Sequence, residues 1–377
     1  MIPLVSVALP PKEILMPKLE EALYGGAPIN EGEAVYKFEH KFISKFGLPT
    51  TSLSMSSGTA ALHTALILAG VSADDEVITT SLTAEPTNLA IKFVGADPVF
   101  ADVDLQSGNL SAKAIEASIT DRTKAVIVVH YAGYPADIVR IRQICDKYDL
   151  VLIEDCAHAL GAKVEGRSVG TFGDYAIFSF QAIKHFTTVD GGFLVCKHSD
   201  NFIRAKKVRW FGMEKGVART KLDITEVGYK YNYQNVFAAI GLVQLDYISE
   251  RLDAHIFNGK YFDRHFEKVI GLNFAKSPKN AEPSYWLYTL ICEDALVATE
   301  LEAYLNSSGI SASKLHKLNH NHKVFDCALE MSETNDLYSR MLHIPCGWWV
   351  NEQERVRIVA AVCEGVKYAK SLQSPTV

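Results

Sequence analysis

A lysine in residues 178–192, FSFQAIKHFTTVDGG, has the neighbours of a reactive amine. Lys184 follows an apolar stretch and precedes two threonines and a pair of glycines, which predicts a polar pocket at the end of a strand. Desolvation in such a pocket lowers the pKa of a lysine, and the neutral amine attacks carbonyl groups. Most lysines in loops are solvated surface groups, so this segment by itself leaves both interpretations open.

A second candidate is the turn at Ser57, Gly58 and Thr59, which precedes the apolar stretch AALHTALILA. Small residues and a glycine at the start of a helix expose backbone N–H groups at the positive end of the helix dipole, which is an anion site. The hydroxyls of Ser57 and Thr59 would be further donors. The same residues also form ordinary helix caps, so the turn alone does not distinguish the two roles.

A third candidate is Asp155, which ends the apolar run Val151-Leu152-Ile153 and is followed by Cys-Ala-His. A carboxylate buried at the end of a strand needs a cation or a hydrogen-bond donor, because an unpaired buried charge is costly. The local pattern also fits an aspartate that caps the next helix. A ligand role for Asp155 and a capping role therefore both stay open at this point.

The elements that must position these residues form an alternating pattern between residues 55 and 200. Strands are predicted at residues 76–80, 98–103, 125–130, 151–155, 175–180 and 193–196, with helices such as 60–69 and 137–147 between them. This alternation is typical of a mostly parallel sheet covered by helices. Ligands of such sheets bind at the carboxyl ends of the strands, where the three candidate segments lie.

The remainder of the chain predicts a second, smaller domain. A long helix pattern at residues 234–252 has no internal breaker, and it is followed by a strand at 286–292, a helix at 298–305 and a final helix at 352–371. We predict a large α/β domain at residues 1–250 and a small α+β domain at residues 251–377, on which the N-terminal segment can pack. The last residues, 373–377, are predicted to be disordered.

The three segments, in this order along the chain, resemble the sugar aminotransferases of the DegT/DnrJ/EryC1/StrS family, within the fold type I pyridoxal-phosphate enzymes. The resemblance runs from about residue 38 to the final helix, and it is most specific around Lys184, in S-G-T-A-A-L and in E-D-C-A-H. It implies a three-layer, mostly parallel sheet of the aspartate-aminotransferase type with a smaller C-terminal α+β domain.

The resemblance also implies roles for individual residues. Lys184 would form a Schiff base with pyridoxal 5'-phosphate and then carry the proton, and Asp155 would pair with the pyridinium nitrogen. His158 would position or contact the cofactor, although a packed helix histidine is an equal alternative. The phosphate would be held by Ser57, Gly58, Thr59 and Ser179.

The segment Gly228-Tyr-Lys-Tyr-Asn232 resembles the family segment that reaches across a dimer interface. By that match Asn232 would contact the phosphate held by the neighbouring subunit, so the active unit would be a homodimer with shared sites. Without the resemblance, the segment is an aromatic-rich loop before a helix. That alternative explains the composition of the segment but not its position.

Two segments depart from the family pattern. Ala84 stands where many members have an aromatic residue that stacks on the cofactor ring, so we expect Tyr131 or Tyr134 to cover that face, unless both are core aromatics. Residues 314–322 are dense in histidine, but no spacing completes a metal site, and a substrate-facing loop or a solvated loop is expected. The expected substrate contacts are Glu85, Tyr131, Tyr134, His185, Lys230 and His316.

The function that the resemblance implies is transamination. An amino acid, expected to be glutamate, would load the cofactor, which then aminates a ketone of a nucleotide-linked sugar for amino-sugar biosynthesis in a surface polysaccharide or a secondary metabolite. One alternative is a pyridoxal-phosphate-dependent sugar dehydratase, in which histidine replaces the lysine; the register from residues 178–180 favours Lys184 over His185. The other alternative is a non-catalytic relative that serves as a subunit or regulator, which predicts loss of the lysine, the aspartate or the phosphate turn.

Composition narrows the partners of this chain of 377 residues. The net charge is -6 and the charges are interspersed, so neither nucleic acid nor an anionic membrane is an expected partner. The N-terminus lacks the features of a signal peptide, and no apolar run approaches the roughly 20 residues that span a bilayer. Seven cysteines without a C-x-x-C pair fit reduced thiols. We therefore expect a soluble, cytoplasmic protein whose partners are small molecules and other subunits.

Overall fold

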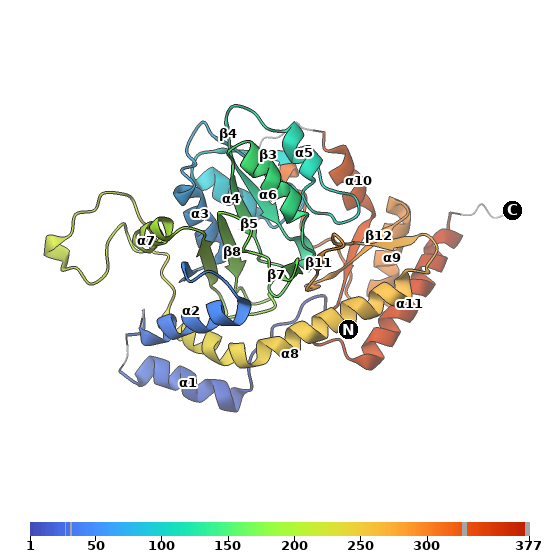
Figure 1. Ribbon diagram of the computed structural model, residues 1–377. Coiled ribbons are helices and arrows are strands. Elements are labelled where there is room, and N and C mark those ends of the chain that lie inside the picture. Colours follow the sequence, from blue (N-terminus) through green and yellow to red (C-terminus); the bar gives the residue numbers. More distant parts are fainter. Residues whose placement is uncertain (27, 31, 326–329, 374–377) are drawn as a thin grey trace.

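A seven-stranded sheet forms the centre of the computed structural model, which describes residues 1–26, 28–30, 32–325 and 330–373 (Figure 1). The strand order is β1-β9-β8-β5-β4-β2-β3, and neighbouring strands are parallel except where β9 pairs with β8 and β1. The predicted mostly parallel sheet is confirmed. Its strands are β1 (Ser52–Met55), β2 (Glu76–Thr80), β3 (Asp97–Ala101), β4 (Thr123–Val129), β5 (Val151–Asp155), β8 (Tyr175–Ser179) and β9 (Gly192–Cys196).

The predicted strands of this sheet agree with the observed ones to within two residues at each end. The strand β1 was not predicted, because its sequence Ser-Leu-Ser-Met carries no apolar run. All four of its residues are nevertheless buried, since they pair with β9 at the edge of the sheet. The chain after β1 enters the turn at Ser57, so this missed strand positions one of the three candidate segments.

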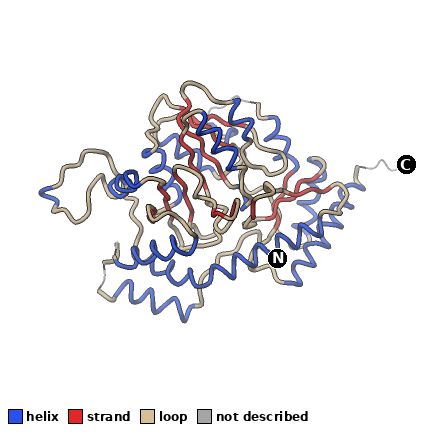
Figure 2. Tube along the Cα trace, viewed as in Figure 1, coloured by secondary structure: helices blue, strands red, loops and turns tan. Residues whose placement is uncertain are grey.

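Helices cover both faces of the sheet, which gives the three layers of the predicted fold (Figure 2). Successive strand residues point to opposite faces, so Ile153 packs toward α3, α4 and α7, while Leu152 packs toward α2, α5, α6 and the first half of α8. These helices are α2 (Glu33–Phe46), α3 (Gly58–Leu68), α4 (Glu85–Phe93), α5 (Ala112–Ala117), α6 (Ile138–Lys147), α7 (Ser199–Val208) and α8 (Asn235–Phe266).

The helix α8 is longer than the predicted 234–252 and links two hydrophobic cores. Its residues Leu245 and Ile248 join the core under the large sheet, whereas Phe262 and Phe266 join the core under a small sheet. Because α8 is continuous through residue 250, the division of the chain at that position stays a prediction. The helix α1 (Lys12–Tyr24) packs alongside α8 (Figure 1).

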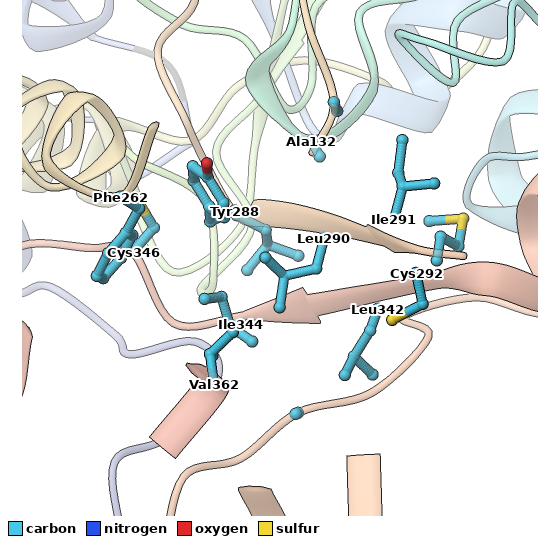
Figure 3. Close-up of a cluster of buried hydrophobic side chains, with 14 of the residues drawn as sticks. Ala132, Phe262, Tyr288, Leu290, Ile291, Cys292, Leu342, Ile344, Cys346 and Val362 are labelled. Atoms are coloured by element: carbon cyan, nitrogen blue, oxygen red, sulfur yellow. The ribbon is translucent and has the colours of Figure 1, made fainter. Parts of the chain in front are cut away.

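The small antiparallel sheet has the strand order β10-β12-β13 and a dense apolar core (Figure 3). Tyr288 and Leu290 of β12 meet Ile344 of β13 and Val362 of α11 in one buried cluster. The bounds are β10 (Leu272–Phe274), β12 (Tyr288–Cys292), β13 (Met341–Ile344), α9 (Ala295–Ser307), α10 (Ser332–Arg340) and α11 (Glu352–Ser371). A third small sheet is formed by β6 (Lys163–Val164), β7 (Arg167–Ser168) and β11 (Ala281–Glu282).

Several other expectations concern the ends and the surface of the chain. Ile2 pairs with the segment after α9, through hydrogen bonds to Gly309 and Ser311. The six cysteines within the described residues are unpaired, and Cys327 lies outside them. Residues 374–377 of the segment predicted to be disordered also lie outside the described residues. Within the described part of the chain, no helix is both long enough and apolar enough to span a bilayer.

Candidate active site

A cavity of about 390 Å³ lies at the carboxyl edge of the large sheet. It brings together the ends of β5 and β8, the starts of α3 and α4, and the loop between β8 and β9, which is the edge where parallel sheets bind ligands. The lining residues include all three candidate segments. They are Ser57, Gly58, Thr59, Leu62, Thr83, Ala84, Pro86, Thr87, Val129, Asp155, Ala157, His158, Ile177, Ser179, Gln181, Ile183, Lys184, Asp190 and His316.

The turn before α3 is both a helix cap and a part of the cavity wall. The Ser57 hydroxyl accepts a hydrogen bond from the backbone N–H of Ala60 at 3.0 Å, which leaves the remaining N–H groups of the first turn available. A Cβ on Gly192 would lie 2.5 Å from the Ser57 carbonyl carbon, and a Cβ on Gly58 would lie 3.1 Å from the Cβ of Ser179. These close backbone contacts shape a narrow cradle at a helix N-terminus, which suits an anion.

Asp155 is buried at the end of β5 and is well supplied with donors. Its Oδ2 accepts a hydrogen bond from the Thr87 hydroxyl at 2.8 Å, and its Oδ1 accepts one from the backbone N–H of Ala157 at 3.0 Å. Burial raises the pKa of the Asp155 carboxyl group, and these hydrogen bonds together with the charge of Lys184 oppose that rise. The carboxylate is thus held in place from two sides within the cavity wall.

Lys184 lies in the loop after β8, as the sequence predicted, and its side chain enters the cavity. Burial lowers the pKa of the Lys184 amine to about 8, and the negative charge of Asp155 opposes this effect. A substantial fraction of the amine is therefore neutral near physiological pH, which is the state in which an amine is nucleophilic.

Trp286 and His158 form a stack beside Lys184. The Lys184 Nζ lies 4.2 Å from the centre of the Trp286 ring, and the His158 ring stacks on the same indole at a centroid distance of 4.1 Å with an interplanar angle of 23°. The Trp286 Nε1–H donates a hydrogen bond to the Ile183 carbonyl oxygen at 2.9 Å. Burial lowers the pKa of His158 well below its ordinary value, so this imidazole is neutral.

His316 and Glu85 lie together near the cavity, from elements far apart in the sequence. The Nδ1 of His316 is 3.8 Å from a Glu85 carboxylate oxygen, and the Nε2 of His322 is 3.5 Å from the other oxygen. Burial lowers the pKa of His316 to about 4, and its buried Nε2 has no hydrogen-bond partner among the described residues. His316 lines the cavity, while Glu85 lies beside the lining residues Ala84 and Pro86.

A buried amide network holds the histidine-dense segment against the start of α4. The Asn88 Nδ2 donates a hydrogen bond to the Asn319 Oδ1 at 2.8 Å, and the Asn319 Nδ2 donates one to the Thr83 carbonyl oxygen at 2.9 Å. The Ser81 hydroxyl pairs with His320 Nδ1 at 2.7 Å. Asn88, Asn319 and Ser81 are fully buried, so the segment that carries His316 is fixed relative to the segment that carries Ala84.

Of the six expected substrate contacts, only His316 lines the cavity wall; Glu85 lies beside it, Lys230 lies outside it, and the other three side chains are buried away from it. Tyr131 is buried behind His158 and hydrogen-bonds His343 at 2.9 Å, and Tyr134 is buried in the core of the small sheet. His185 turns away from the cavity to meet the Ser284 carbonyl oxygen at 3.2 Å. Since Ala84 lines the cavity, the rings available on its wall are the imidazoles of His158 and His316 rather than the two tyrosines.

Lys230 and Asn232 lie on the strand-like segment after the projecting loop, outside the cavity wall. The Lys230 Nζ donates a hydrogen bond to the Asn232 Oδ1 at 3.0 Å, and Asn232 pairs with Met55 through a backbone bridge. This bridge places the segment directly beside the chain that leads into the phosphate turn. The contact of Asn232 with a neighbouring subunit stays a prediction.

Sequence reasoning missed several residues that shape the site, above all Thr87, Trp286 and Asn319. Thr87 lies close to Ala84 in the sequence, and its spacing of four residues from Thr83 is the available signal. Trp286 was interpreted only as the start of a strand. No local signal connects Trp286 to Lys184, because the two residues meet only through the packing of the small sheet against the large one.

One further cluster of possible metal ligands, His130, Glu154 and Cys156, lies elsewhere in the core. Glu154 accepts hydrogen bonds from the backbone N–H groups of Gly170, Phe172 and Gly173 and pairs with His130 at 3.1 Å. The carboxylate is therefore satisfied by the protein itself, and its role is to hold the loop after β7 against β5.

The comparisons with known proteins agree with this architecture. The DegT/DnrJ/EryC1/StrS aminotransferase family matches residues 12–363. An uncharacterized protein of Methanocaldococcus jannaschii is 36% identical over 270 residues, 70% of each chain. GDP-perosamine synthase of Escherichia coli O157:H7 is 34% identical over 276 residues, 73% of this chain and 74% of that protein.

Solved structures are similar to this chain over a larger part of its length. The sugar aminotransferase CalS13 from Micromonospora echinospora has a TM-score of 0.92 and 32% identity, covering 97% of this chain and 100% of that one. The predicted fold type I architecture is confirmed by this likeness. The chain therefore belongs to the DegT/DnrJ/EryC1/StrS aminotransferase family and is a pyridoxal-phosphate-dependent sugar aminotransferase.

Proposed function

We propose that this enzyme transfers an amino group from an amino acid, glutamate, to the keto group of a nucleotide-linked sugar. The observation that carries the proposal is the meeting of the Lys184 amine, the Asp155 carboxylate and the anion cradle before α3 in one cavity. The relatives support the substrate class, because one is named GDP-perosamine synthase and another is a sugar aminotransferase.

The residues of the cavity fit pyridoxal phosphate group by group. Ser57, Gly58, Thr59 and Ser179 would hold the phosphate, because the narrow cradle leaves free N–H groups at a helix N-terminus. Asp155 would face the pyridine nitrogen, and Lys184 would bind the aldehyde carbon. When bound, pyridoxal phosphate supplies an electron sink for bond breaking at the carbon that carries the amino group.

Lys184 is also suited to move a proton within the cavity. With a pKa of about 8, the free amine accepts and returns a proton near physiological pH without a large energetic penalty in either direction. Asp155 would remain ionised beside a cation, because the Thr87 and Ala157 donors stabilise its charged form. His158 and His316 are neutral, so they would contribute hydrogen bonds and apolar ring surface rather than positive charge.

The substrate would approach from the side of Glu85 and His316. The unpaired buried Nε2 of His316 is available to a hydroxyl group of a sugar, and the half-exposed Glu85 carboxylate can accept further hydroxyl hydrogen bonds. Lys230 would lie near the nucleotide if a neighbouring subunit completes the site.

A cytoplasmic homodimer with shared sites is part of the proposal. The segment between α7 and α8 projects from the body of the protein (Figure 1) and exposes the apolar residues Val217, Ile224 and Val227. Exposed apolar groups on a projecting segment are typical of a subunit contact. The product would enter amino-sugar biosynthesis for a surface polysaccharide or a secondary metabolite.

The two alternatives from the sequence are less well supported by this geometry. A dehydratase would need a histidine in place of the lysine in the cavity, but Lys184 lines the cavity and His185 points away from it. A non-catalytic relative would have lost part of the site, whereas the lysine, the aspartate and the phosphate turn are all present together.

The proposal is tested by offering glutamate labelled with ¹⁵N and a panel of nucleotide-linked keto sugars to the purified enzyme. Mass spectrometry of the sugar products is expected to show the label on one member of the panel. Lys184→Ala should abolish both the transfer and the borohydride-sensitive visible absorbance of the cofactor. The matched control is Lys317→Ala, which removes an exposed lysine of the histidine-dense segment and should retain the transfer. Full transfer by Lys184→Ala would refute the proposal.

A further inference from the structure

Trp286 reaches Lys184 from a different part of the fold. The indole comes from the segment before β12 of the small sheet, is 1% exposed, and lies with its face toward the Lys184 Nζ at 4.2 Å. Its Nε1–H is fixed by the Ile183 carbonyl oxygen at 2.9 Å, and its ring is fixed by the His158 stack. The position of the ring is therefore determined from three sides, and one of these contacts is the backbone of the residue next to Lys184.

The face of an indole attracts a cation through its quadrupole, and the attraction is larger where water is excluded. The other titratable groups whose charge interacts with Lys184 are Asp155 and the imidazoles of His158, His185 and His316. Burial keeps these three imidazoles neutral, so they do not stabilise a cation. The stabilisation of a Lys184 ammonium group thus comes from the Asp155 carboxylate and the Trp286 ring.

We propose that Trp286 is a positioning residue that holds the free Lys184 ammonium group against its indole face whenever the lysine is not joined to the cofactor. The inference rests on the proposed function, in which Lys184 binds the cofactor, is released in the first half of the reaction and rejoins the cofactor at the end of the second half. During that interval the side chain needs a defined resting place, because a flexible lysine would lose the geometry for proton transfer. The ring raises the lysine pKa less than a second carboxylate would, so it slows the recapture of the cofactor less.

When free pyridoxal phosphate is added to the apoenzyme, the Lys184 nitrogen would join its aldehyde carbon and one water molecule would leave; at the end of turnover the same bond would form as the amine of the sugar product leaves. Only the neutral amine begins this step, so the rate of capture follows the deprotonated fraction of Lys184. The wild-type rate is expected to rise with pH with a midpoint near 8. Since the ring stabilises the ammonium form, its removal should move this midpoint to lower pH, by about 0.4 to 1.5 pH units.

The experiment measures the rate of pyridoxal phosphate capture by the apoenzyme as a function of pH, from the visible absorbance that develops. Trp286→Leu removes the aromatic face but keeps apolar bulk, and Trp286→Phe keeps an aromatic face but loses the Nε1–H donor. We expect the midpoint to fall in the order wild type, Trp286→Phe, Trp286→Leu. Trp349→Leu is the matched control, because it removes an indole that packs on His255 at 5.7 Å, and its midpoint should stay at the wild-type value.

The outcomes separate the inference from the proposed function. An unchanged or raised midpoint in Trp286→Leu, or equal shifts in Trp286→Leu and Trp286→Phe, would overturn the role of the ring. If Trp286→Leu does not fold, as judged by thermal unfolding, the capture midpoints of Trp286→Tyr and Trp286→Phe decide the question. Both midpoints should lie below that of the wild type, and unchanged or raised midpoints would overturn the role of the ring. If Lys184→Ala apoenzyme captures the cofactor as wild type does, the proposed function fails instead.

Discussion

The Thr87 hydroxyl is predicted to stabilise the charged form of Asp155, and the effect should be visible in the pH dependence of protein stability. The hydroxyl donates at 2.8 Å to an oxygen of a carboxylate that is 3% exposed. A hydrogen bond to a charged group contributes about 1.5–3 kcal/mol. Thr87→Val keeps the shape of the side chain and removes this donor, so the apoenzyme should lose about that much free energy of unfolding at neutral pH.

The pH dependence of this loss has a definite sign. Burial raises the pKa of Asp155 above its value in the unfolded chain, so the folded protein binds the Asp155 proton more tightly. The ionisation of Asp155 therefore does not lower the free energy of unfolding at low pH. Its destabilising effect grows as the pH rises from the pKa of the unfolded chain to that of the folded protein, and it is complete above the folded-state pKa. Thr87→Val raises the folded pKa further, so its destabilisation should be largest at neutral pH and should shrink on acidification.

Urea unfolding of the apoenzyme at several pH values measures the effect. The control is Thr83→Val, which removes the 3.1 Å hydroxyl pair between Thr83 and Thr87 without touching Asp155, so its cost should not depend on pH in the same way. In an Asp155→Asn background, Thr87→Val should cost less, because no charge remains to be stabilised. The reasoning would be refuted if Thr87→Val and Thr83→Val had the same pH dependence.

Two further predictions concern the walls of the cavity. Gly192→Ala places a Cβ 2.6 Å from the backbone nitrogen of Gly58, so pyridoxal phosphate should bind about tenfold more weakly or worse in equilibrium dialysis; wild-type affinity would contradict the cradle. Asn319→Ala removes the acceptor of one Asn88 amide N–H group and the donor to the Thr83 carbonyl oxygen, which should cost about 1–3 kcal/mol of stability. Because the segment that carries His316 is then loosened, KM for the sugar should rise more than kcat falls. An unchanged KM would contradict the role of the buried amide network in fixing this segment.

The sequence predicted the structure correctly wherever the residues that carry a pattern are also the residues that form the predicted element. The apolar runs of β2 and β5 predict these strands at their observed bounds, since a buried parallel strand needs only such a run. The polar residues that follow the strands predict the edge of the sheet at which the cavity lies, because the carboxyl ends of parallel strands meet there. Lys184, Asp155 and the Ser57 turn all line that cavity.

Local patterns failed where the neighbouring sequence carries too little information. The strand β1 has no apolar run and exists because β9 offers its edge for pairing. Tyr131 and Tyr134 follow β4 closely enough to suggest a place in the cavity, but the packing of the small sheet covers both side chains. Their burial depends on residues more than a hundred positions away, such as His343.

The sequence by itself identified the segments that carry the chemistry, and the family resemblance that joins them indicated its class, because the reactive residue types and the strands that end beside them lie within short segments. The partners that tune this chemistry were decided only by the tertiary structure. Thr87 meets Asp155 across 68 positions, Trp286 meets Ile183 across 103, and Asn88 meets Asn319 across 231. The physical reason is that each pair is brought together by the packing of separate elements, whose relative placement depends on the whole core and not on any one segment.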